Sequence, residues 1–76
     1  MNLYIINEVL SDYTFGMVVI AADSLDRCRE MFIAEFGNDW QPTIDEYDGA
    51  IKRGSYKVLA VRDQEEGIVS HVFGGG

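Results

Sequence analysis

Side chains that could take part in catalysis are few in this sequence and lie far apart along the chain. His71 is the one histidine and Cys28 the one cysteine. A nucleophilic site needs a nucleophile, a base and a group that orients the base, all within hydrogen-bond reach. Ser70 precedes His71, but adjacent residues of a strand point to opposite faces of a sheet. We therefore expect His71 to be a partly exposed strand residue and the protein not to be an enzyme.

Cys28 lies on the apolar stripe of a predicted helix, together with Leu25 and Phe32. A buried cysteine usually behaves as a small hydrophobic residue. Arg27 and Arg29 could lower the pKa of an exposed thiol, but they point to other sides of the helix. A single cysteine also excludes an internal disulfide and a thiolate zinc cluster. We expect a core residue, and a protein of the reducing cytoplasm.

The acidic residues form two groups that could be examined as metal sites: Asp45, Glu46 and Asp48 in one, and Asp63, Glu65 and Glu66 in the other. Calcium needs six to eight oxygen ligands around a tight glycine turn. Neither group has the alternating spacing or the number of oxygens for this. The terminal glycines are not a phosphate-binding loop, because no helix follows them and no lysine is near. We expect no metal and no cofactor.

Charge is the property in which this sequence departs most from an average domain. Thirteen acids face six bases, so the formal net charge is −7. Phosphate binding requires clustered Lys and Arg, and direct binding of nucleic acid is therefore not expected. A partner with a basic surface is the natural complement of the two acidic groups. The alternative is that the acids serve only solubility.

Aromatic residues near the acids are candidate anchors for such a partner, because Tyr and Trp beside charges are typical of binding hot spots. The candidates are Tyr13, Trp40 and Tyr47. The alternative is that Trp40 fills the gap between helix and sheet and that the two tyrosines border the core. The predicted partner-binding set is therefore three aromatic residues and the six acids named above.

Four segments have the composition and alternation of strands: residues 3–10, 15–22, 55–63 and 67–73. Short polar links, SDYT and QEEG, predict a hairpin at each end of the chain. Gly16 would allow a bulge or a close approach of another segment. Gly74, Gly75 and Gly76 have no side chains to pack, and we expect them to fray.

Two segments between the strand pairs have helical patterns. In residues 24–36, Asp23 or Ser24 can cap the helix, apolar residues recur at helical spacing, and Gly37 is a left-handed terminator. Residues 43–53 have the Thr43 and Glu46 spacing of a capping box, but Gly49 opposes a helix, so a loop stays the alternative.

The expected architecture is a single α+β domain, residues 1–76, in the order β-β-α-(α)-β-β. A four-stranded antiparallel sheet carries one amphipathic helix on one face, with a short second helix left open. The strands are apolar on both faces, so either Trp40 and the second helix or another copy of the chain must cover the other face. A homodimer is thus an open alternative. No apolar run reaches about 18 residues, and no basic leader precedes the first strand, so we expect neither a membrane span nor a signal peptide.

The strand LYIINEV and the strand-to-helix junction AADSL resemble those of small phage and prophage proteins, including small anti-CRISPR inhibitors of type I systems. The resemblance covers most of the chain as a layout and rests on few residues: Tyr4, Ile5, Ile6, Glu8, Val9, Ala21, Ala22, Ser24 and Leu25. Most of these positions belong to strands and a helix cap, so they indicate fold more than target.

The resemblance implies an inhibitor that binds a host CRISPR effector stoichiometrically and blocks nucleic-acid binding or nuclease recruitment, without catalysis or cofactor. This chain departs from the basic members of that group because it is strongly acidic. That difference favours a nucleic-acid-mimicking mode, in which carboxylates occupy a basic groove of the partner. A small homodimeric accessory protein is the alternative.

Overall fold

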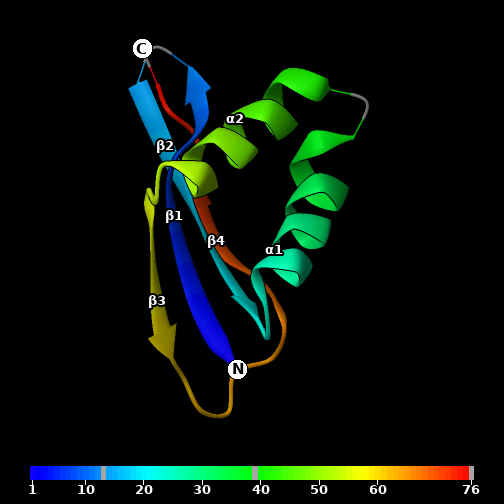
Figure 1. Ribbon diagram of the computed structural model, residues 1–76, viewed down its shortest axis with the longest axis vertical. Helices are drawn as coiled ribbons and strands as arrows, with labels where there is room; N and C mark the ends of the chain where they lie inside the picture. The colour runs from blue at the N-terminus through cyan, green and yellow to red at the C-terminus, as the bar shows by residue number, and fades with distance from the viewer. Residues whose placement is uncertain (13, 39, 76) are drawn as a thin grey trace.

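The fold is a four-stranded antiparallel sheet with two helices, seen in a computed structural model that describes residues 1–12, 14–38 and 40–75 (Figure 1). The elements, in chain order, are β1 (Asn2–Asp12), β2 (Thr14–Ala22), α1 (Leu25–Phe32) continued by a π-helical segment (Ile33–Gly37), α2 (Gln41–Lys52), β3 (Tyr56–Ala60) and β4 (Gly67–Val72). The predicted α+β class and the four-stranded antiparallel sheet are confirmed, and the second helix is present. Within the described residues, no helix has the length and apolarity needed to cross a membrane.

The predicted hairpin at QEEG is wrong, because β3 and β4 lie at opposite edges of the sheet. The strand order is β3-β1-β2-β4, so each late strand pairs with one strand of the central β1–β2 hairpin. That hairpin offers two free edges, and either can accept an antiparallel strand. The connection at residues 61–66 can reach about 20 Å, which exceeds the roughly 14 Å across three strand spacings.

Alternation along the central strands separates a covered face from an open one. Tyr4, Ile6, Val18 and Ile20 point toward the helices and are buried, and α1 contacts β2 and β4 while α2 contacts β1. Both helices therefore pack on the same face of the sheet. The expectation that Trp40 and the second helix cover the other face is wrong, because Trp40 is 63% exposed.

An irregularity at the end of β1 turns the chain toward α2. Glu8 and Leu10 have φ of 61° and 53°, and the pairing with β2 shifts register between Asn7 and Val9. Such a bulge bends a strand and re-aims its side chains. As a result Val9 and Leu10 are both buried, although neighbours in a regular strand would point to opposite faces.

Helix α1 forms as predicted at its start and differs at its end. The Ser24 hydroxyl accepts a hydrogen bond from the Arg27 backbone N–H at 3.1 Å, and Cys28 and Phe32 are fully buried. Gly37 is not a left-handed terminator, because the chain continues through it as the last residue of the π-helical segment. Gly37 is needed for contact instead, since a Cβ there would lie 3.0 Å from Ile44 of α2.

Helix α2 begins two residues before the predicted position, so the Thr43 and Glu46 capping box does not form. Trp40 is the N-cap residue and provides no side-chain hydrogen bond, and Pro42 lies in the first turn, where its missing N–H does no harm. Glu46 is available for another contact, and its Oε1 accepts a hydrogen bond from the Ser11 backbone N–H at 3.2 Å.

The glycine tail is held in place at Gly74 and Gly75, and Gly76 lies outside the described residues. Gly74 is buried and donates its N–H to the Leu10 carbonyl at 2.9 Å, while Gly75 N–H donates to the Thr14 hydroxyl. The predicted fraying is therefore wrong at these two residues. A Cβ at Gly74 would collide with the Thr14 carbonyl, so the missing side chain is what permits the close approach. Gly16, where close approach was predicted, lies in the same way against the carbonyls of Val72 and Val9.

Candidate acidic interface

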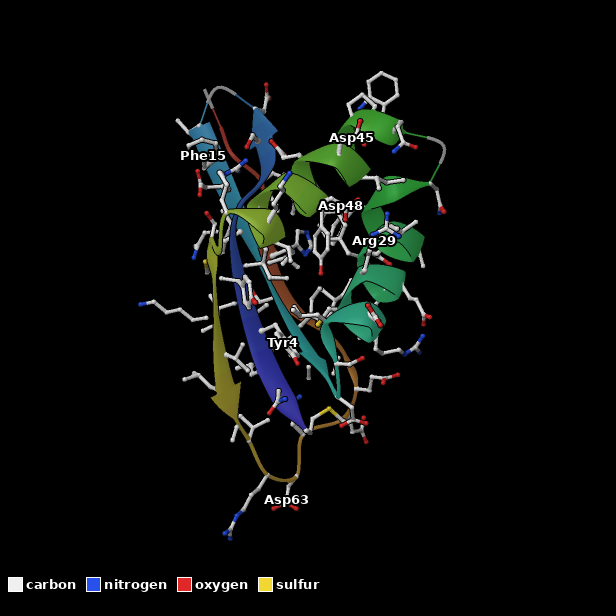
Figure 2. All side chains as sticks on the ribbon, viewed as in Figure 1. Tyr4, Phe15, Arg29, Asp45, Asp48 and Asp63 are labelled. Atoms are coloured by element: carbon white, nitrogen blue, oxygen red, sulfur yellow. The ribbon has the colours of Figure 1, made fainter. Side chains whose placement is uncertain are left out.

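The predicted acidic residues do not form one surface. Asp45 lies on α2 near one end of the molecule, whereas Asp63 lies in the loop between β3 and β4 at the other end (Figure 2). The molecule is 35 Å long. Asp63 and Glu65 therefore belong to a region distinct from Asp45 and Glu46, and a single partner groove would have to span both ends to contact them all.

Asp48 is engaged by a basic residue of the same chain. Arg29 of α1 donates from Nε to Asp48 Oδ1 at 2.8 Å and from Nη2 to Oδ2 at 3.0 Å. This bidentate pair joins α1 to α2. The guanidinium holds the pKa of the Asp48 carboxyl below its usual value. The Asp48 carboxylate thus stabilises the packing of α1 on α2, and this contact occupies the oxygens that a partner would need.

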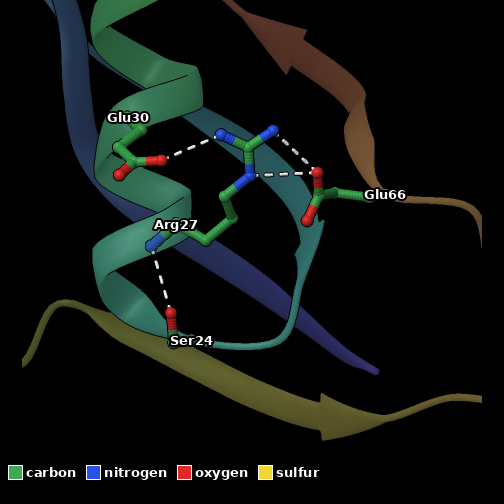
Figure 3. A network of polar contacts seen from close by, with 4 residues as sticks. All are labelled: Ser24, Arg27, Glu30 and Glu66. Carbon is green, nitrogen blue, oxygen red and sulfur yellow. Dashed lines mark hydrogen bonds and ion pairs between the residues drawn. The ribbon is translucent and has the colours of Figure 1, made fainter.

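Glu66 is also engaged by an arginine of α1 (Figure 3). Arg27 donates from Nε and Nη2 to Glu66 Oε1 at 2.9 and 2.8 Å, and from Nη1 to Glu30 at 2.8 Å. The hydrogen bonds from Arg27 lower the pKa of Glu66. The contact holds the β3–β4 loop against α1.

The three predicted aromatic anchors have different fates. Tyr47 is only 1% exposed and stacks on Phe32 with ring centroids 4.5 Å apart, so it is a core residue and not a surface anchor. Ile44, Tyr47 and Ile51 lie at positions i, i+3 and i+7 of α2, which is the spacing of one apolar helix face. Trp40 is exposed and could contact a partner. Tyr13 lies outside the described residues.

Three carboxylates from separate elements meet instead around a concavity of about 440 Å³, here called the acidic hollow. Asp12 comes from the end of β1, Glu35 from the π-helical segment and Glu46 from α2. The other lining residues are Leu10, Ser11, Phe36, Thr43, Phe73 and Gly74. Within residues 1–12, 14–38 and 40–75, none of the three carboxylates forms an ion pair.

Local features of the chain explain why these three side chains meet. The bulge in β1 brings Ser11 to Glu46, and the adjacent Asp12 follows. The π-helical segment carries Glu35 past the end of α1 toward the start of α2. Phe73 packs edge-on against Phe36 with ring centroids 5.9 Å apart, which closes the side formed by the C-terminal tail.

An acidic hollow with aromatic walls is suited to a cationic group. Carboxylates attract Lys or Arg side chains, and aromatic rings add a favourable interaction with the same cation. Among the residues that the structure describes, no hydrogen bond joins a hydroxyl of the hollow, on Ser11 or Thr43, to one of its carboxylates. His71 packs edge-on against two aromatic residues of the hollow, Phe36 and Phe73, and no group of His, Cys, Asp and Glu among the described residues could hold a metal ion. The arrangement can bind a cationic group.

Cys28 and His71 match the roles that were predicted for them. Cys28 is fully buried, and loss of contact with water raises the pKa of its thiol to about 12, so it stays neutral at physiological pH. His71 is an exposed residue of β4. Its register partner is Val18, whereas the partner of Ser70 is Val19, so the two side chains point to opposite faces.

Glu35 and Phe73 are the hollow residues that sequence reasoning missed. The sequence places Glu35 in the helix predicted over residues 24–36, Phe73 at the end of the strand predicted over residues 67–73, and Asp12 in the first turn. No local signal brings these residues together, because their distances in sequence are long and the contact depends on the bulge and on the path of the tail.

Comparisons with known proteins leave the family open. No protein-family model matches this sequence, and neither the search of curated proteins nor the search of solved structures returned a match. The properties of the site therefore carry any functional conclusion.

Proposed function

We propose that this chain is a non-catalytic binding protein of the phage type, similar to anti-CRISPR inhibitors, that binds a basic nucleic-acid-binding surface of a host protein complex. The observation that carries the proposal is the acidic hollow, whose carboxylates have no cationic partner within the described fold. The partner would supply the missing cations. Its place of action would be the cytoplasm of a bacterial host.

Asp45 and Trp40 enlarge the hollow into a proposed binding surface at this end of the molecule. Asp45 lies next to Glu46 on α2, accepts a hydrogen bond from Gln41 and is exposed. Trp40 precedes the first residue of α2 with 63% of its surface exposed. An exposed tryptophan beside unpaired carboxylates has the composition of an interface hot spot. Of the predicted partner-binding residues, the proposed surface keeps Trp40, Asp45 and Glu46. It also includes Asp12 and Glu35, which were not in the predicted set.

The mechanism of inhibition would be competition for positive charge. A groove that holds a phosphate backbone presents several Lys or Arg side chains. Carboxylates fixed on a rigid end can occupy those cations and exclude the nucleic acid, without any covalent step. Binding of this kind weakens as salt rises, because exposed charges are screened over about 8 Å at physiological ionic strength.

A pull-down from a CRISPR-bearing bacterial lysate, followed by quantitative proteomics, tests the proposal. The wild-type bait is compared with Glu35→Gln/Glu46→Gln and with the matched control Asp63→Asn/Glu65→Gln. Each variant loses two negative charges, so both have a formal net charge of −5 instead of −7. We expect a nucleic-acid-handling protein to be enriched by the wild type and the control and to be lost with the hollow variant.

A competition assay with the captured protein makes the test sharper. The proposal requires that nucleic acid of the captured protein's own class displaces the bait. Enrichment of no nucleic-acid-handling protein, or equal enrichment by all three baits, would rule out the acidic hollow as the binding site.

A further inference from the structure

The face of the sheet that points away from the helices is apolar and uncovered. We call it the open face. Its apolar members alternate with the buried residues of the strands and are Leu3, Ile5, Phe15, Met17, Val19, Leu59 and Val72, while Asn7, Lys57 and Ser70 are the polar residues that share its register. Leu3 pairs with Leu59, and Met17 with Val72, and paired residues of antiparallel strands project to the same side. The open face therefore continues across all four strands.

Exposure along this face is high for large hydrophobic residues. Phe15 is 67% exposed, Val72 54% and Leu59 50%. Leu3, Ile5 and Val19 on the central strands are partly buried by their neighbours alone, since both helices lie on the other side. Contiguous apolar patches of several hundred square ångströms on a small protein mark an interaction site.

Charge is almost absent from the open face, although the protein is strongly acidic. Lys57 is the one charged residue among its regular register positions, and it lies on the edge strand β3, where its ammonium can stay in water. Glu8 borders the face and is engaged by Arg53 and by the Ser55 hydroxyl. The acids that the structure describes are therefore placed almost entirely elsewhere.

We propose that the open face packs against the open face of a second copy, so that the protein forms a two-fold symmetric dimer of stacked sheets. Two molecules with a net charge of −7 repel each other, and a surface without acids is where this repulsion opposes close approach least. A basic partner would find no carboxylate to bind on this face. Two antiparallel sheets pack face to face about 10 Å apart through interdigitating apolar side chains.

The size of the face fits a dimer of moderate affinity. Four strands about 4.8 Å apart and about eight residues long cover roughly 500 Å² per copy. Two copies would bury about 1,000 Å², close to the lower limit for a specific interface. A domain of this length buries only about 60% of its unfolded surface and gains stability from a second layer.

Such a dimer leaves the acidic hollow free. The hollow is formed by the bulged end of β1, by the helical layer and by the C-terminal tail, whereas the open face lies on the other side of the sheet. The inference does not rest on the proposed function, since it concerns a different surface. A dimer would present two acidic hollows, one on each copy.

Sedimentation velocity over a concentration series tests the dimer. Protein from about 5 µM to about 500 µM should shift from monomer to dimer if the dissociation constant lies in the micromolar range expected for this area. Added salt should strengthen the dimer because it screens the repulsion between copies. Binding through the acidic hollow responds to salt in the opposite direction, so failure of one proposal is distinguishable from failure of the other.

Two adjacent substitutions give a matched pair. Leu59→Lys places a charge on the open face, and Val58→Lys places it one residue earlier on the other face of the same strand, at a similar exposure of 45% against 50%. Both lower the net negative charge, so weaker association cannot be attributed to added repulsion between acids. We expect Leu59→Lys to raise the dimer dissociation constant at least about tenfold and Val58→Lys to change it less than about twofold.

Phe15→Lys is a second open-face variant in case Leu59→Lys does not fold, which circular dichroism would reveal. It should weaken the dimer in the same way. A wild-type protein that stays monomeric throughout the series overturns the inference. So does a dimer that tolerates both open-face substitutions, or one that only Val58→Lys disrupts.

Discussion

The two faces of the sheet have similar composition and different environments. Val18 and Val19 are neighbours in β2; Val18 is fully buried beneath the helices, and Val19 lies on the open face with part of its surface in water. Apolar residues on a strand therefore do not reveal which face the rest of the chain will cover. The covering is decided by the path from β2 through both helices to β3, which stays on one side of the sheet.

The largest difference in stability between the two faces is expected when Phe32→Ala, on the covered face, is compared with Phe15→Ala on the open face. Phe32 is fully buried and packs on Phe36 and Tyr47, so its truncation should lower the free energy of unfolding by about 3–5 kcal/mol. Phe15→Ala on the open face should lower it by less than about 0.5 kcal/mol when the protein is dilute and monomeric. Urea denaturation measures both. Equal losses would show that the open face is covered within the monomer.

Val18→Thr and Val19→Thr make the same chemical change on opposite faces. A hydroxyl at the buried position has no water to bond with, and we expect a loss of about 1–3 kcal/mol. At Val19 the hydroxyl can reach solvent, and the loss should stay within about 0.5 kcal/mol. Denaturation midpoints of the two variants would be compared at one dilute concentration. A reversed order would mean that the faces are assigned wrongly.

Tyr47→Phe sharpens the account of the covered face. The Tyr47 hydroxyl is buried without a hydrogen-bond partner in the described structure. Removal of an unsatisfied buried hydroxyl, with the ring and its stacking on Phe32 retained, should raise the free energy of unfolding by about 1 kcal/mol. Thermal unfolding would detect the gain. A decrease of similar size in the free energy of unfolding would show that the Tyr47 hydroxyl does have a hydrogen-bond partner.

Acid should weaken the ion pairs that hold the helical layer, and this is the smallest effect expected. Arg29 and Arg27 lower the pKa of Asp48 and Glu66 from the usual 3.8 and 4.5 in the folded state. A carboxyl whose pKa is lower in the folded than in the unfolded state stabilises the fold at pH values above its unfolded-state pKa. This contribution disappears as the pH falls from that value through the folded-state pKa. It is therefore present at pH 7 and decreases below about pH 4.5.

Asp48→Asn/Glu66→Gln isolates this contribution. The difference in urea midpoint between the wild type and the double variant should be present at pH 7 and should shrink toward zero near pH 3. The pairs are exposed, so the difference at pH 7 should be modest. A difference that is constant with pH would show that the contribution of the two carboxylates to stability does not depend on their charge.

Sequence reasoning was most successful for features with a short repeat. The Leu25, Cys28 and Phe32 stripe identified α1, and alternation identified the four strands. The errors arose where contacts are distant in sequence. QEEG has the composition of a hairpin turn, yet pairing of β3 with β1 placed the two strands at opposite edges. Asp48 and Glu66 appeared free until the fold brought Arg29 and Arg27 beside them.

The sequence by itself determined the four strands and the first helix, the charge of the protein, and the presence of two apolar faces on its strands. Those properties depend on local periodicity and on composition, which are readable without a fold. Only the tertiary structure decided which face is covered, which carboxylates lack a cation, and that Asp12, Glu35 and Glu46 meet at one hollow. The physical reason is that each of these depends on contacts between segments whose separation in sequence carries no signal of their proximity in space.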